Sequence, residues 1–119
     1  MKKLPKNSTS SNAISISVNV SVASRVDKSS NKDDKTILIP ANKTFSLSID
    51  YPLNMPRRFA VKSGKNGVKL TKLIDIICDK YHEAYKEDSN IWGHYIEDLY
   101  LESIVVDYEN KEVRLEVGS

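Results

Sequence analysis

The residues of this chain that could do chemistry are one thiol, two imidazoles and a nearby carboxylate. Cys78 and His82 stand four residues apart, a spacing that places two side chains on one face of a helix. His94 and Asp98 lie in the loop that follows. These residue types can hold a zinc ion, and a cysteine beside a histidine can also form a reactive thiolate. The four residues are therefore the candidates for a metal site or a thiol enzyme.

The pattern around these residues favours a structural interpretation. A free cysteine at the edge of an apolar helix stripe behaves as a small hydrophobic residue. No paired CxxC, HxxxH or HExxH motif occurs, and no motif of a known nucleophile surrounds Cys78. The Gly64-Lys65-Asn66-Gly67 run lacks the ending of a phosphate-binding loop. We expect no enzymatic activity, no metal and no cofactor, with metal or thiol chemistry at the four candidates as the weaker alternative.

A basic segment offers a different chemistry, the binding of phosphate backbones. No acidic residue occurs between Tyr51 and Ile74, and this interval holds Arg57, Arg58, Lys62, Lys65, Lys69 and Lys72. Cations that share a face can follow the phosphates of a nucleic acid. The acidic half of the chain opposes this function, because residues 75–119 carry a net charge of −8 against +10 for residues 1–74. A solvated or internally paired basic face is the simpler interpretation.

One amphipathic helix is predicted over residues 71–87. Its apolar residues recur at helical spacing and form one stripe: Leu70, Leu73, Ile74, Ile77, Tyr81, Ala84 and Tyr85. Ile76 falls outside the stripe, so we expect it to be exposed and available to a partner. Acids recur at every fourth position, at Asp75, Asp79, Glu83 and Glu87, where like charges repel. Lys72 and Lys86 flank this ladder, which is either a docking face for the basic segment or solvated helix surface.

Alternating apolar and polar residues predict strands on both sides of this helix. The runs cover residues 13–23, 37–39, 44–51, 58–63, 99–107 and 112–117. In the run 44–51, the residues expected to face inward are Phe45, Leu47, Ile49 and Tyr51. Apolar residues change phase within 99–107, which predicts a bulge near Ser103.

The predicted fold class is α+β. A mostly antiparallel sheet packed on one amphipathic helix buries every apolar face. From Phe45 onward the order of strand, strand, helix, strand, strand is β-grasp-like, with an extra strand at the N-terminus. This analogy of architecture carries no function.

The N-terminal strand is a candidate for contact with a second chain. Its apolar face consists of Ile14, Ile16, Val18, Val20 and Val22, and about a dozen polar residues separate it from the next strand. A strand on a long tether can pair within its own sheet or add to the edge of a partner's sheet. Exchange between identical chains gives a symmetric dimer; an ordinary local hairpin is the alternative.

Aromatic residues concentrate in the segment 91–102, which holds the only tryptophan, Trp92, together with His94 and Tyr95. Trp and Tyr serve as interface anchors because they offer a large contact area with few rotatable bonds. They serve equally as core residues. We therefore treat this segment as a second candidate contact surface.

Two sequence stretches carry a resemblance. They are YPL-x-x-PRRF, from Tyr51 to Phe59, and WGH-x-x-x-DL, from Trp92 to Leu99. With the helix between them, the chain from Phe45 onward resembles small uncharacterised proteins of large DNA viruses and protists. The resemblance implies no activity and no catalytic residue, and it favours a viral source.

Length and composition indicate one domain. The 119 residues are enough to bury a core. Residues 1–12 are polar and aperiodic, so we expect a disordered tail before a single domain at 13–119. No apolar run approaches the ~20 residues that cross a bilayer, and no apolar region follows Lys2 and Lys3 as a secretion signal requires. With Cys78 as the only cysteine, we expect a soluble protein in the cytoplasm or another reducing compartment, or associated with a virion.

The function that these patterns favour is a non-enzymatic interaction or structural module that self-associates, as a homodimer, or binds another protein. Nucleic-acid binding through the basic segment is the alternative, and no membrane is involved. The expected contact residues are Trp92, His94, Tyr95, Ile14, Ile16, Val18, Val20 and Ile76.

Overall fold

The computed structural model of the protein describes residues 12–27, 36–87 and 94–118. The expected N-terminal tail lies outside these residues except for Asn12, whose carbonyl accepts a hydrogen bond from the Tyr108 N–H at 2.8 Å. Trp92 also lies outside them. No helix in the described ranges is long and apolar enough to cross a membrane.

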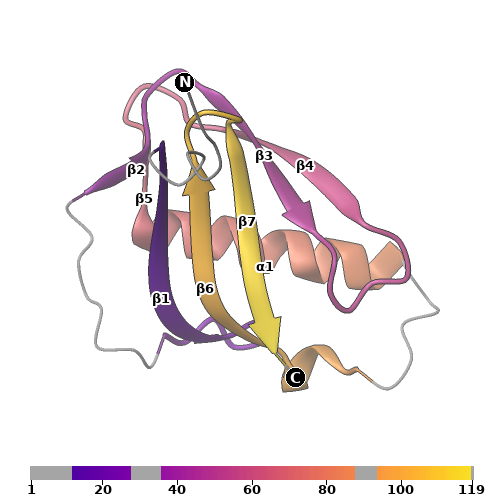
Figure 1. Ribbon diagram of the computed structural model, residues 1–119. Helices are drawn as coiled ribbons and strands as arrows, with labels where there is room; N and C mark the ends of the chain where they lie inside the picture. The colour runs from indigo at the N-terminus through magenta and orange to yellow at the C-terminus, as the bar shows by residue number, and fades with distance from the viewer. Residues whose placement is uncertain (1–11, 28–35, 88–93, 119) are drawn as a thin grey trace, which may run out of the picture.

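A five-stranded sheet forms one layer of the fold. Its strands are β1 (Ala13–Ser21), β3 (Thr44–Ile49), β4 (Arg57–Lys62), β6 (Tyr100–Asp107) and β7 (Glu112–Gly118). They lie side by side in the order β1-β6-β7-β3-β4, so β1 and β4 are the edges (Figure 1). All neighbours are antiparallel except β3 and β7, which are parallel. The sheet is therefore mostly antiparallel, as predicted.

The α-helix α1 (Leu70–Glu87) crosses behind this sheet and forms the second layer, and a short 3-10 helix, η2 (Ile96–Asp98), precedes β6 (Figure 1). The predicted stripe of α1 is buried, apart from Tyr85, which packs half-buried against the core. Apolar residues of β1, β3, β6 and β7 complete the same core. The predicted α+β class is confirmed. The β-grasp-like order stays an analogy, because a two-residue strand β5 (Val68–Lys69) also stands between β4 and α1.

The predicted phase change in the strand 99–107 is confirmed. The pairing of β6 with β7 shifts register between Leu101 and Ser103. On the other side of β6, the pairing with β1 shifts between Ser17 and Val20. The extra residue lets Leu101 and Ile104 both point into the core, which strict alternation forbids.

A short two-stranded sheet and a turn connect the main layers. Strand β2 (Ile37–Ile39) pairs with β5. The expected turn after β4 is present, with Gly64 and Gly67 at φ values of 67° and 72°. At Gly67 a Cβ atom would stand 2.7 Å from the Ile39 carbonyl oxygen, so both the backbone conformation and the space require glycine.

Three placements differ from the sequence predictions. Tyr51 lies beyond the end of β3 and is exposed, because the chain turns at 51–52 before its side chain can enter the core. Ile76 is not exposed but packs partly buried against the core. The strand β1 forms no hairpin with β2; it pairs with β6, which is far away in the sequence.

Candidate interaction surfaces

The Cys78 thiol belongs to the core. It is fully buried, and this burial raises the pKa of the thiol to about 11. At neutral pH the sulfur is therefore protonated and a poor nucleophile. The His82 Nδ1 contacts the Cys78 main chain, because it lies 2.8 Å from the Cys78 carbonyl oxygen and donates to it.

His94 contacts different residues from His82. Its ring packs edge-on against Tyr51, with centroids 5.4 Å apart, and its Nδ1 lies 3.4 Å from the tyrosine hydroxyl. Its carbonyl accepts a hydrogen bond from the Tyr85 hydroxyl at 3.0 Å. Over the described ranges, no three His, Cys, Asp or Glu residues converge on a point that could hold a metal. The contacts found for His94 tie its loop to α1 and to the turn after β3.

The acidic ladder of α1 pairs largely with cations of the same chain. Arg25 reaches both Asp75 and Asp79, each at 2.6 Å. Farther along, Lys80 pairs with Glu83 and Arg57 pairs with Glu87. The flanking lysines that the sequence suggested, Lys72 and Lys86, make no ion pair in the described part of the chain. Arg25 was missed because it follows β1, and only the β1–β6 pairing brings it to the helix.

The basic segment divides into paired arginines and unpaired lysines. Arg57 binds Glu87 at 2.6 Å and Arg58 binds Glu112 at 3.3 Å. The remaining cations are exposed and make no ion pair with any described residue: Lys62, Lys65, Lys69 and Lys72. Only Arg57 of this segment docks on the helix ladder.

The expected contact residues are spread over several surfaces. Val18 and Val20 are buried in the chain's own core, whereas Ile14 is 40% exposed and Ile16 is half-buried. Tyr95 is 68% exposed at the far end of the sheet. The apolar residues of β1 and the aromatic loop therefore do not form one patch in the described structure.

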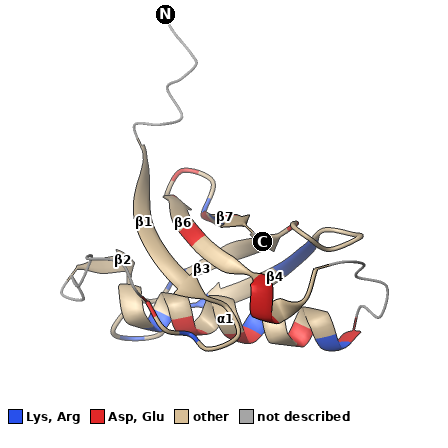
Figure 2. Cartoon of the chain, turned by 90° about the horizontal axis from the view of Figure 1, so that it is seen from below, with Lys and Arg blue, Asp and Glu red and all other residues tan. Residues whose placement is uncertain are grey.

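The two edges of the sheet differ in chemistry. The edge strand β4 carries Arg57, Arg58 and Lys62 and follows a proline. The edge strand β1 has the sequence AISISVNVS, without a charged residue or a proline (Figure 2). Its end at residues 19–21 is covered by the next turn, through the bridge between Val20 and Asp27. Its first part, residues 13–18, has no strand on its outer side among the described elements.

A groove that sequence reasoning missed lies between β3 and β7. The two strands pair only at Ser46 with Glu112 and at Leu47 with Val113, and then diverge (Figure 1). The divergence leaves a groove of about 930 Å³. No local sequence pattern predicts this groove, because the pairing of β3 with β7 joins residues more than sixty positions apart.

A carboxylate network holds the turn that leads into this groove. The Asp107 carboxylate is almost fully buried and accepts hydrogen bonds from the N–H groups of Glu109 and Asn110, each at 3.1 Å. The Asn110 side chain and Arg114 donate to its other oxygen. These donors lower the pKa of Asp107 to about 2. The network fixes the start of β7 and the direction of Arg114.

Comparisons with known proteins complete the description of these surfaces. No family model, no curated protein and no solved structure matches the chain. The resemblance to viral and protist proteins therefore stays a prediction.

Proposed function

We propose that this protein is a non-enzymatic interaction module that self-associates through strand β1. The observation that carries the proposal is the outer edge of β1 at residues 13–18, which has no neighbouring strand among the described elements. A free strand edge presents unpaired N–H and C=O groups, which can pair with another strand. The buried, protonated Cys78 thiol supports the non-enzymatic part of the proposal.

The contrast between the two edge strands favours β1 over β4 as the strand that contacts a second chain. Proteins protect exposed edges with charged residues, prolines and bulges, which prevent edge-to-edge pairing. The edge β4 has such protection in Arg57, Arg58 and Lys62, next to Pro56. The first part of β1 has no charge and no proline, so a second β1 can approach without like-charge repulsion.

A twofold arrangement of two β1 strands preserves the apolar pattern. If the antiparallel pairing is centred on Ile16, then Ile14 of one copy lies opposite Val18 of the other. Serines then face serines, with Ser15 opposite Ser17 of the second copy. The partly exposed Ile14 side chain gains a neighbour on the core side of the sheet. Two five-stranded sheets become one continuous sheet.

Such a contact is small and therefore weak. It joins about six residues on each chain. The area that these residues can bury is well below the ~1,200–2,000 Å² of standard stable interfaces. We expect a dissociation constant in the micromolar range and dimers that exchange readily.

Light scattering and native mass spectrometry over a range of concentrations test the proposal. The wild-type chain should pass from monomer to dimer. The double variant Ser15→Lys/Ser17→Lys should stay monomeric, because each new lysine faces a lysine of the second copy. The matched control Ser15→Glu/Ser17→Lys adds as many charges but places Glu opposite Lys, so it should still dimerise.

A wild-type chain that stays monomeric at high concentration would contradict the proposal. So would a double-lysine variant that dimerises as well as the wild type. Circular dichroism of both variants separates a lost contact from a lost fold.

Nucleic-acid binding is a second candidate function, favoured by the four lysines that have no ion-pair partner in the described structure. Their charge is free to contact phosphates, whereas Arg57 and Arg58 already contact carboxylates. Fluorescence anisotropy with a labelled DNA duplex should show salt-sensitive binding. Replacing Lys62, Lys65, Lys69 and Lys72 by glutamine should weaken that binding far more than Arg58→Gln does. No binding at low salt removes this candidate.

A further inference from the structure

The groove between β3 and β7 is bounded by two strand edges. Beyond Val113, β7 still pairs with β6 on one side, but no described strand pairs with it on the side of β3. Residues 114–118 of β7 therefore offer an open edge about 17 Å long, at ~3.3 Å per residue. The end of β3, at Ser48, forms the opposite wall, and among the described strands it pairs there only with β4. This length matches about five residues of an extended chain.

The lining of the groove includes apolar side chains among its charged ones. Leu115 and Val117 are half-buried and pack against the core while they line the groove. Tyr81 also lines it, and its hydroxyl donates to the Tyr51 carbonyl oxygen at 2.7 Å. A volume of about 930 Å³ lies within the ~300–1,000 Å³ of ordinary ligand pockets. The groove can thus take up side chains as well as backbone.

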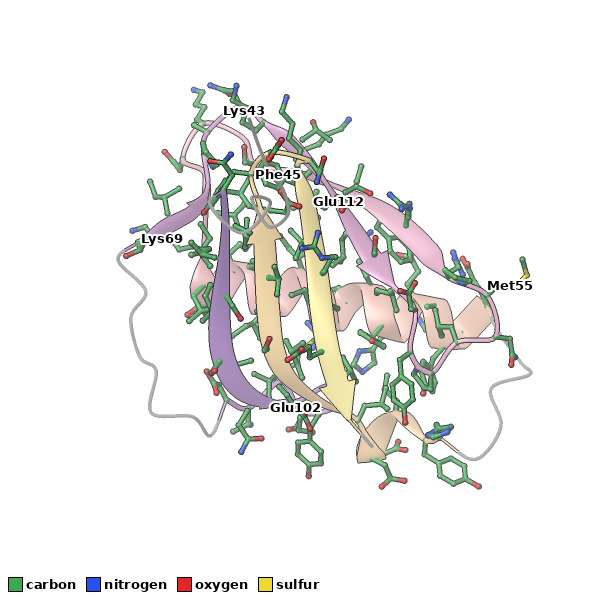
Figure 3. The ribbon with its side chains drawn as sticks, viewed as in Figure 1. Lys43, Phe45, Met55, Lys69, Glu102 and Glu112 are labelled. Atoms are coloured by element: carbon green, nitrogen blue, oxygen red, sulfur yellow. The ribbon has the colours of Figure 1, made fainter. Side chains whose placement is uncertain are left out.

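The lining of the groove carries more acidic than basic side chains. Its charged lining residues are Asp50, Arg58, Glu102, Glu112, Arg114 and Glu116. Both arginines contact Glu112, and Arg114 also binds Asp107. Figure 3 shows Glu112 near the end where the strands pair and Glu102 at the other end. Asp50, Glu102 and Glu116 make no ion pair with any described residue, so three carboxylates remain for a ligand.

We propose that this groove binds an extended peptide segment that carries lysine or arginine residues. Its backbone pairs with the open edge of β7 at residues 114–118, as an added strand. Alternate side chains of the peptide turn toward Leu115 and Val117, while its cations meet Asp50, Glu102 and Glu116. The negative lining excludes nucleic acid and acidic peptides from the same place, because like charges oppose them.

This site is separate from the proposed dimer contact. The strand β1 forms one edge of the sheet, and β6 stands between it and β7 (Figure 1). Occupancy of the groove and self-association can therefore be measured and lost independently.

Fluorescence anisotropy with the full chain tests the proposal directly. The probe is a fluorescein-labelled peptide of about ten residues that alternates lysine with threonine, and the comparison probe replaces each lysine by glutamate. The lysine peptide should bind saturably at low salt, and the glutamate peptide should not bind. Added salt should weaken the binding.

Groove variants locate the site. Asp50→Asn/Glu116→Gln should weaken binding of the lysine peptide by about three- to tenfold. The matched control Glu97→Gln/Glu109→Gln removes two exposed carboxylates outside the lining and should leave the affinity unchanged. Ser48→Trp fills the groove without changing a charge and should abolish binding.

Hydrogen exchange separates strand addition from general attraction of a basic peptide. Saturating peptide should slow the exchange of main-chain amides within 114–118 and leave those of β1 unchanged. Equal weakening by the groove and control variants, or no added protection at 114–118, would overturn the proposal. Thermal unfolding of each variant shows whether a lost affinity reflects a lost fold, and a folded Ser48→Trp chain that binds normally also overturns it.

Discussion

Replacing Asp107 by asparagine should destabilise the fold in a way that depends on pH. The carboxylate accepts four hydrogen bonds and is almost fully buried. An asparagine in the same position keeps one accepting oxygen, but its amide group faces two donors, Arg114 and the Asn110 side chain. The tight turn between β6 and β7 depends on this network, and with it the start of the groove edge.

The size of the effect follows from the depressed pKa. Asp107 titrates at about 2 in the folded state against an ordinary value of 3.8. Because one pKa unit corresponds to about 1.4 kcal/mol, the ionised carboxylate contributes about 2.5 kcal/mol of stability. A depressed carboxyl pKa stabilises the fold at pH values above the unfolded pKa. The contribution should be complete above about pH 5, about 1.3 kcal/mol at pH 3 and about 0.4 kcal/mol at pH 2.

Urea denaturation of wild type and Asp107→Asn between pH 6 and pH 2 measures this contribution. The difference in unfolding free energy between the two proteins should fall by about 2 kcal/mol over that range. At pH 6 the variant should melt roughly 8 °C lower. Taking the difference between two proteins cancels the titration of the other carboxylates. A difference that is the same at every pH would show that the Asp107 pKa is not depressed, and would refute the reasoning.

Three further changes probe the helix and the core. Replacing Arg25 by glutamine removes its ion pairs with Asp75 and Asp79; because these carboxylates are exposed, urea titration should show a loss below about 1 kcal/mol that shrinks in high salt. Replacing Tyr81 by phenylalanine removes a hydrogen bond to a main-chain carbonyl and should cost about 1 kcal/mol in the same assay. Cys78 should react with a thiol reagent at pH 8 only as the chain unfolds, and rapid labelling of the native protein would argue against its burial.

Local patterns in the sequence predicted most of the elements. The apolar stripe of α1 is buried as its spacing requires, because a helix on one face of a sheet has a single way to cover its apolar side. The phase change near Ser103 predicted the bulge, since two buried residues three apart cannot share one face of a regular strand. The prediction that Ile76 is exposed was wrong, because the core extends around the helix beyond the central stripe.

Long-range pairing accounts for what the sequence did not reveal. The position of β1 beside β6 places Arg25 on the acids of α1, and nothing near Arg25 in the chain indicates that partner. The groove depends on where β3 and β7 stop pairing, which is decided by the twist and bulges of the whole sheet. Lysines of the basic segment make no ion pair with any residue that the structure describes, while its arginines are paired, and composition cannot make this distinction.

Hydrogen exchange of β1 at low and high protein concentration tests self-association most directly. Dimerisation through this edge predicts that main-chain amides within 13–18 exchange more slowly as the concentration rises, while those of the other edge strand, β4, do not change. The Ser15→Lys/Ser17→Lys chain should show no such dependence. Exchange of residues 13–18 that is identical at both concentrations in the wild-type chain would contradict the proposal.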